Sequence, residues 1–136
     1  RTLTDNDIFY NPDAGLPRGE REFAAAATSR FNGCIFCASV HARFAAHVLD
    51  DPSEVQRLLE DGIDARLDAR HRAIVDAATA LTRTPVEFGA DHVAALRDVG
   101  LDDQSIADLV HASAFFNWAN RLMLSLGEPD ATGVAL

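Results

Sequence analysis

Across the 136 residues of this chain, no segment shows the sustained alternation of apolar and polar side chains that a half-buried β-strand requires. Apolar residues instead recur at helical spacing, and residues that start or stop helices bound each such stretch. We therefore predict an all-α, single-domain helical bundle of about six helices. The expected helices cover residues 17–31, 34–49, 53–61, 69–82, 90–99 and 103–126.

The two ends of the chain lie outside these helices. Residues 1–15 contain an Asn-Pro-Asp sequence followed by Gly15, which is typical of loops, and we expect an N-terminal arm that packs locally. Residues 16–128 would form the helical domain, and residues 129–136 would form a C-terminal tail. No internal repeat and no Gly-, Pro- or Ser-rich linker divides the domain.

Composition and charge disfavour several classes of partner. The 12 Lys and Arg residues against 21 Asp and Glu residues give a net charge of −9, and no basic run offsets it. We therefore expect neither a nucleic acid nor a membrane as a partner. The longest apolar runs are broken well before about 18 residues and nothing resembles a signal peptide, so we expect a cytoplasmic protein.

The residues that most strongly indicate a reactive site are 33–41, which contain both cysteines of the chain and end on a histidine. With about 100° of rotation per residue, Cys34, Cys37 and His41 fall within roughly a 60° sector of one helix. The polar stripe of that helix lies elsewhere, at Ser39, Arg43, His47 and Asp50. The two sulfurs and the imidazole are therefore expected to point inward. Two cysteines spaced as CxxC favour redox or metal chemistry over a structural disulfide.

A cysteine attacks only as its thiolate, so a reactive thiol needs a feature that lowers its pKa from about 8.5. Cys34 would lie at the positive N-terminal end of the helix, and Cys37 one turn before His41, which can accept its proton. The spacing lets one sulfur resolve the other, so the pair can cycle between dithiol and disulfide. Glu22 lies on a helix face of small residues, where a tight helix crossing can perturb the pKa of a carboxylate.

Two other interpretations of the cysteine pair stay open at this stage. The cysteines could be two small apolar core residues one turn apart. They could also bind zinc together with His41, with Glu22 or a water as the fourth ligand. Closed zinc sites usually take a second ligand pair from another element, and none is visible here. We rank a redox function above both and expect no bound metal or organic cofactor.

The spacing Glu22, eleven residues, Cys34-Ile35-Phe36-Cys37, three residues, His41 resembles the active-site signature of the AhpD-like alkylhydroperoxidases. These proteins belong to the carboxymuconolactone decarboxylase superfamily. Residues 116–127 are similar to the closing helix of its uncharacterised peroxidase-related branch, and the helical layout agrees over roughly residues 16–128. One departure is Phe36, which stands where some members carry a histidine just before the second cysteine.

The resemblance implies an antioxidant peroxidase that reduces a hydroperoxide with its cysteine pair. By position, Cys37 would be the peroxidatic thiolate, Cys34 the resolving thiol, and His41 with Glu22 the proton relay. The helix dipole by itself favours Cys34 as the sulfur of lower pKa. The implied partners are hydrogen peroxide or an organic hydroperoxide as substrate and a dithiol or a disulfide-carrying protein as reductant. Members are typically homo-oligomers of helical subunits, so we expect a homo-oligomer.

Two rival functions follow from the same residues. One is a non-catalytic redox-sensing or interaction module, in which closing the disulfide only changes helix packing or subunit contacts. The other is a carboxymuconolactone decarboxylase-like enzyme, which has no evident need for a CxxC pair. The apolar residues around the cysteines favour an organic hydroperoxide over hydrogen peroxide.

Overall fold

The computed structural model describes residues 1–128, and the expected tail, residues 129–136, lies outside them. The described residues form seven α-helices and one 3-10 turn and contain no β-strand, so the all-α prediction is confirmed. The elements are α1 (Thr2–Tyr10), α2 (Arg18–Asn32), α3 (Ile35–Val48), α4 (Ser53–Asp61), η1 (Gly62–Asp64), α5 (Ala69–Thr82), α6 (Ala90–Asp98) and α7 (Asp103–Leu126). None of these helices combines the length and apolar character needed to cross a membrane.

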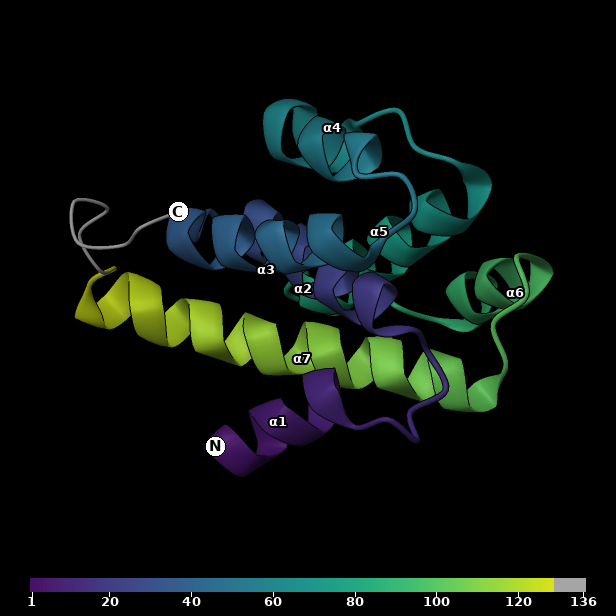
Figure 1. The fold of residues 1–136 in the computed structure, drawn as a ribbon, viewed down its shortest axis with the longest axis horizontal. Coiled ribbons are helices and arrows are strands. Elements are labelled where there is room, and N and C mark those ends of the chain that lie inside the picture. Colours follow the sequence, from purple (N-terminus) through teal and green to yellow (C-terminus); the bar gives the residue numbers. More distant parts are fainter. Residues whose placement is uncertain (129–136) are drawn as a thin grey trace.

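Helix α2 is the centre of the fold, and α3, α5 and α7 pack around it (Figure 1). All residues from 19 to 29 are buried, including four consecutive alanines at 24–27 with no exposed surface. Side chains this small let the neighbouring helices approach α2 closely on every side. The larger apolar core, built around Phe23, Leu58, Ile74, Leu96 and Leu109, fills the space between α2 and the helices from α3 to α7.

Helix α1 is the main difference between the predicted and the observed fold. Residues 2–10 were expected within an irregular arm, but they form a helix that packs against α2 and α7 (Figure 1). The Phe9 side chain is 2% exposed, and the Arg21 Nη1 atom donates a hydrogen bond to the Ile8 carbonyl at 2.5 Å. These tertiary contacts stabilise a helix that has no side-chain N-cap and little local amphipathic pattern.

The turn between α2 and α3 decides where the cysteines lie. Gly33 ends α2 in the left-handed conformation, with φ 77°, which a residue with a Cβ adopts only with strain. The Cys34 amide then donates to the Ser29 carbonyl at 3.0 Å and the Gly33 amide to the Arg30 carbonyl at 3.3 Å, as in a Schellman motif. Cys34 consequently becomes the N-cap residue of α3.

A second, smaller core cluster surrounds the cysteine pair. It consists of the buried residues Phe9, Ala25, Cys34, Cys37, Ala112 and Phe116 from α1, α2, α3 and α7. Next to it, the fully buried Asn120 of α7 donates to Ser29 Oγ at 2.9 Å and accepts from Asn32 Nδ2 at 3.1 Å. These hydrogen bonds fix α7 against the C-terminal end of α2, which is the end that leads into the cysteine turn.

Candidate active site

The two cysteines form a disulfide at the start of α3, with their Cα atoms 5.4 Å apart. Cys34 is the N-cap residue and Cys37 lies in the first turn, so both sulfurs are close to the positive N-terminal end of the helix. The helix dipole therefore acts on Cys37 as well as on Cys34. Both residues are buried, with 0% of Cys34 and 5% of Cys37 exposed.

The structure brings Glu22 of α2 against His41 of α3. The Glu22 Oε2 atom lies 2.6 Å from His41 Nδ1, and both side chains are buried. The other carboxylate oxygen of Glu22 accepts from Arg18 at 3.3 Å. With Nδ1 engaged by the carboxylate, Nε2 is the imidazole nitrogen available for proton exchange elsewhere. Arg18, Glu22 and His41 thus form a hydrogen-bonded chain that orients the ring.

Two phenylalanines hold the His41 ring from the other sides. The ring centroid of Phe116, on α7, lies 3.9 Å from that of His41 in an edge-on arrangement, and that of Phe9, on α1, lies 5.1 Å away. The two phenylalanine rings also contact each other, at 5.5 Å. Together with the Glu22 contact from α2, these contacts hold the imidazole from three separate elements and restrict it to one orientation.

A cavity of about 290 Å³ lies between α1, α2, α3 and α7 and is lined by Cys37, His41 and Glu22. Apolar side chains make up most of its wall, among them Phe36, Phe44 and Met123. Cys34 does not line this cavity and instead borders a separate one of about 460 Å³ beside Leu59. Of the two cysteines, Cys37 is therefore the one that shares a space with the Glu22–His41 pair.

The three α1 residues of this cavity had no signal in the sequence, and a fourth lies in the closing helix that the family resemblance covers. Asp5, Phe9 and Tyr10 reach it from α1, and Phe116 reaches it from α7. Burial is the largest effect on the carboxyl of Asp5 and raises its pKa, while the His41 charge lowers that pKa and the Glu22 charge raises it. These four side chains lie on elements far from the CxxC motif in sequence, so no local spacing could have indicated them.

A different group of side chains in the described residues has the donor atoms of a possible metal site. Donor atoms of Glu54, Asp68 and His71 lie within 4.8 Å of one another. The Glu54 carboxylate, however, already contacts His71 Nδ1 and the Arg57 guanidinium, and it accepts from the Asp68 amide at 2.5 Å. These contacts join α4 to the start of α5, so the group has a structural explanation without a metal.

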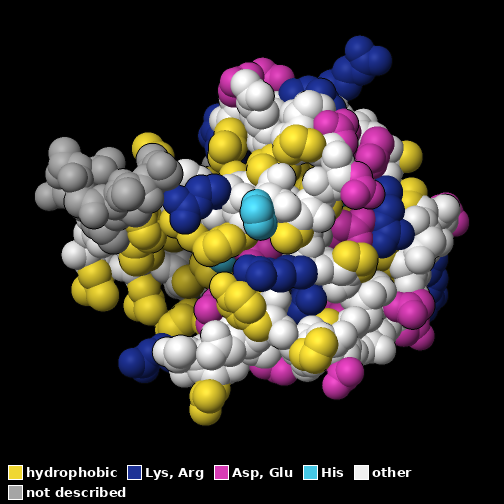
Figure 2. Space-filling model, in the orientation of Figure 1, with side chains coloured by type: hydrophobic (Ala, Val, Ile, Leu, Met, Phe, Trp, Pro, Cys, Tyr) yellow, Lys and Arg dark blue, Asp and Glu magenta, His cyan; other side chains and the backbone are white. Residues whose placement is uncertain are grey.

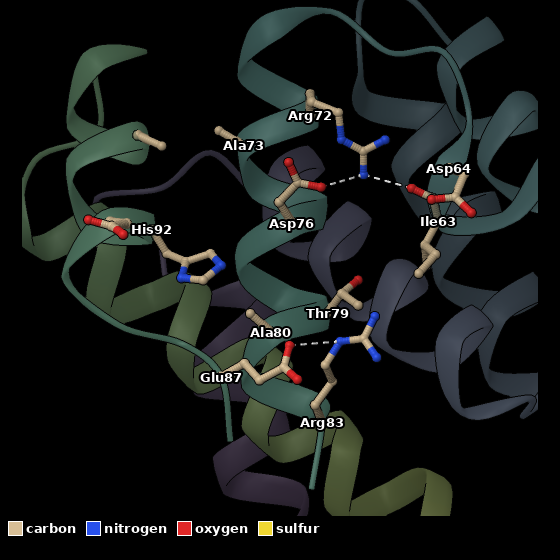
Figure 3. Close-up of a pocket in the computed structure, with 12 residues that line it drawn as sticks. Ile63, Asp64, Arg72, Ala73, Asp76, Thr79, Ala80, Arg83, Glu87 and His92 are labelled. Carbon is tan, nitrogen blue, oxygen red and sulfur yellow. Dashed lines mark hydrogen bonds and ion pairs between the residues drawn. The ribbon is translucent and has the colours of Figure 1, made fainter. Parts of the chain in front are cut away.

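A polar cavity of about 380 Å³ lies along α5, between η1 and α6 (Figure 3). The charged side chains of Arg72 and Arg83 point toward it but pair with acidic neighbours on the same stretch of chain. The Arg72–Asp76 and Arg83–Glu87 ion pairs measure 2.8 Å and 3.2 Å. This cavity contains no cysteine, and we place the candidate site at Cys37 instead.

Fold and site together define a helical protein with a buried cysteine pair beside a carboxylate–imidazole pair. The model of the carboxymuconolactone decarboxylase family matches residues 1–80, more than half of the chain. The protein therefore belongs to the carboxymuconolactone decarboxylase family, in the superfamily that its resemblance to the AhpD-like proteins implied. A comparison with curated proteins gives no significant match.

Solved structures with the same fold agree with this assignment. An uncharacterized peroxidase-related protein from Silicibacter sp. TM1040 is 30% identical, with a TM-score of 0.82 over 96% of this chain and 69% of that one. An AhpD-core, uncharacterized peroxidase-related protein from Ralstonia eutropha JMP134 is 27% identical, with a TM-score of 0.80 over 91% of this chain and 65% of that one. A protein of unknown function from Agrobacterium tumefaciens, 22% identical, shares the fold with a TM-score of 0.70 over 91% of this chain and 83% of that one.

Proposed function

We propose that this protein is a thiol-dependent peroxidase that reduces hydroperoxides with Cys37 and Cys34. The observation that carries the proposal is the placement of Cys37 in one cavity with the Glu22–His41 pair. A reactive cysteine needs a nearby base and a partly positive environment, and this cavity supplies both. The peroxidase-related names of two structural relatives support the same reaction class.

In the reduced protein, His41 would accept the proton of Cys37, and Glu22 would stabilise the imidazolium that forms. The Cys37 thiolate then attacks the outer oxygen of the hydroperoxide, so that a sulfur–oxygen bond forms and the oxygen–oxygen bond breaks. The sulfur becomes a sulfenic acid. The other oxygen of the peroxide leaves as an alkoxide or hydroxide, which is protonated to an alcohol or water. Cys34 attacks this sulfenic acid, water leaves, and the disulfide closes.

The cavity also favours one class of substrate. Its wall is largely aromatic and aliphatic, and its volume of about 290 Å³ accommodates a small organic group beside the sulfur. We therefore propose an organic hydroperoxide in preference to hydrogen peroxide. A dithiol, free or carried by a protein, would return the disulfide to the reduced state.

The deciding experiment is hydroperoxide consumption by the purified protein with excess dithiothreitol, using cumene hydroperoxide and hydrogen peroxide. We expect many turnovers per chain, faster with cumene hydroperoxide. Replacing Cys37 by serine should abolish turnover. Replacing Cys34 by serine should, in the absence of dithiothreitol, allow a single oxidation of Cys37 to the sulfenic acid, because no second protein thiol can close the disulfide. The variant His47→Ala, at an exposed position of the same helix, is the matched control and should keep full activity.

Two results would count against the proposal. Consumption of only one peroxide per chain, with a change in oligomeric state on oxidation, would favour a redox sensor. Full activity in Cys37→Ser would remove Cys37 as the nucleophile. A zinc assay on the same preparation checks the metal interpretation of the cysteine pair independently of turnover.

A further inference from the structure

Asp5 is the carboxylic acid in the cavity that the mechanism above does not use. It lies on α1 one turn before Phe9, is half-buried, and lines the same cavity as Cys37 and His41. Within residues 1–128 its carboxylate makes no hydrogen bond or ion pair, whereas both oxygens of Glu22 are held by His41 and Arg18. Asp5 is therefore the acid of this cavity whose oxygens are available to a bound substrate.

The reaction needs a proton at a particular place. When a thiolate displaces an oxygen from a hydroperoxide, the leaving oxygen lies on the side of the attacked oxygen away from the sulfur. That leaving oxygen receives the electron pair of the broken bond and becomes a strong base unless an acid protonates it. His41 is on the same helix as Cys37 and accepts the thiol proton, so a donor on another wall is better placed for the leaving oxygen.

We propose that Asp5 is the acid that protonates the leaving oxygen when Cys37 reacts with a hydroperoxide, an inference that rests on the peroxidase function proposed above. Asp5 belongs to α1, a wall of the cavity separate from the α3 helix that carries the sulfur. Its one-turn spacing from Phe9 puts both residues on the same face of α1, and Phe9 packs against the His41 ring.

The charged groups around Asp5 suit this role. Those that share its cavity are Glu22 from α2 and His41 from α3, with Arg18 behind Glu22, while α7 contributes Phe116, Ala119 and Met123, which are uncharged. Burial favours the neutral acid and raises the pKa of Asp5, and the His41 charge lowers it. Proton transfer from Cys37 to His41 therefore makes Asp5 a stronger acid at the moment when the leaving oxygen needs its proton.

The protons and electrons balance without a further reactant. Cys37 gives its proton to His41, Asp5 gives its proton to the leaving oxygen, and the His41 imidazolium returns a proton to Asp5. The sulfur loses two electrons to the peroxide, which is reduced to an alcohol. The net reaction of this step is a thiol and a hydroperoxide giving a sulfenic acid and an alcohol.

The test compares the variant Asp5→Asn with the wild-type protein on two oxidants that differ in their leaving group. tert-Butyl hydroperoxide releases a strongly basic alkoxide, whereas peracetic acid releases weakly basic acetate, which hardly needs an acid. We expect the second-order rate of Cys37 oxidation to fall by about 10²-fold with tert-butyl hydroperoxide and to change little with peracetic acid. Asp7→Asn, on the exposed side of α1, is the matched control and should keep both rates.

Stability measurements separate this role from a structural one. Because burial raises the pKa of Asp5, its ionised form destabilises the fold. This cost in free energy appears as the pH rises above 3.8, the pKa of the aspartate in the unfolded chain. Asp5→Asn should therefore raise the free energy of unfolding at neutral pH and leave it nearly unchanged below pH 3.8. If the variant is more stable than the wild-type protein but reacts more slowly with tert-butyl hydroperoxide alone, Asp5 donates a proton and the slower rate is not caused by damage to the fold.

Three outcomes would overturn the assignment. An unchanged rate with tert-butyl hydroperoxide shows that Asp5 donates no proton. Equal losses with both oxidants show a structural effect of α1. If the wild-type protein reacts with neither oxidant, the proposed peroxidase function fails, and the role of Asp5 fails with it.

Discussion

At the scale of single residues, the site depends on how one buried carboxylate is shared. Glu22 is 1% exposed, and it binds His41 with one oxygen and Arg18 with the other. A buried carboxylate without partners would be costly, so these two contacts explain how it is tolerated in the centre of the fold. They also orient His41 toward the cavity that Cys37 lines. The same interactions therefore serve folding and the proposed chemistry.

The first prediction concerns this pair. Glu22→Gln keeps the size and one hydrogen bond of the side chain but removes the charge that stabilises an imidazolium at His41. We expect the rate of Cys37 oxidation by cumene hydroperoxide to fall by about 10²-fold, measured by stopped-flow fluorescence. Glu60→Gln, an exposed glutamate on α4, is the control. A Glu22→Gln protein that folds normally and reacts at the wild-type rate would show that the carboxylate is not part of the relay.

At the scale of elements, α1 has a role that its sequence did not indicate. It closes one side of the cavity and supplies Asp5, Phe9 and Tyr10 to it. The Asp108 carboxylate of α7 accepts from the Gly15 and Leu16 amides at 2.7 and 2.9 Å, which fixes the loop after α1. The Arg18 guanidinium lies 4.1 Å from the centre of the Tyr10 ring and adds a cation–π contact. α1 is thus held from both α2 and α7.

The second prediction tests what holds α1 in place. Phe9→Ala removes a side chain that is 2% exposed, a change that costs about 3–5 kcal/mol in protein cores. Because α1 is a terminal helix, we expect this loss to appear as local undocking. Amide hydrogen exchange in α1 should quicken by about 10²-fold while α2 keeps its protection. The control Leu3→Ala, at an exposed position of α1, should leave amide exchange in both α1 and α2 unchanged. Equal acceleration in α1 and α2 would show instead that the two helices unfold as one unit.

At the scale of the whole molecule, hydrophobic side chains gather on the surface along the C-terminal half of α7 (Figure 2). Trp118, Leu122, Leu124 and Leu126 are between 40% and 84% exposed. The chain carries a net charge of −9, which by itself opposes association between copies. We propose that this apolar surface contacts a second copy of the chain, which is the homo-oligomer that the family resemblance implies.

The third prediction follows from that surface. Leu124→Glu adds a charge at the centre of the apolar stretch, and we expect it to shift the protein from an oligomer to a monomer in sedimentation velocity at micromolar concentration. The control Leu3→Glu adds the same charge to an exposed leucine of α1 and should leave the assembly unchanged. A monomeric wild-type protein would contradict the expected homo-oligomer.

Much of the fold followed from local signals in the sequence. Of the seven helices in residues 1–128, six lie within one or two residues of the predicted ranges, because caps and apolar periodicity act within a single segment. The placement of Cys37 and His41 on one inward face followed in the same way, since helical spacing alone decides which residues share a face. The pairing of Glu22 with His41 was indicated by the resemblance to AhpD-like proteins, and their contact is a property of how α2 and α3 cross.

The tertiary structure decided what the local signals could not. α1 has almost no amphipathic pattern, so its helix forms because Phe9 and Ile8 contact α2 and α7. The cavity exists because four helices converge, and its lining includes Asp5 and Phe116, more than a hundred positions apart. The sequence by itself determined every described helix except α1, and the residues that carry the proposed chemistry, because those depend on near neighbours. Only the packing of distant segments decided which cysteine shares a cavity with the Glu22–His41 pair and which further acid lines that cavity.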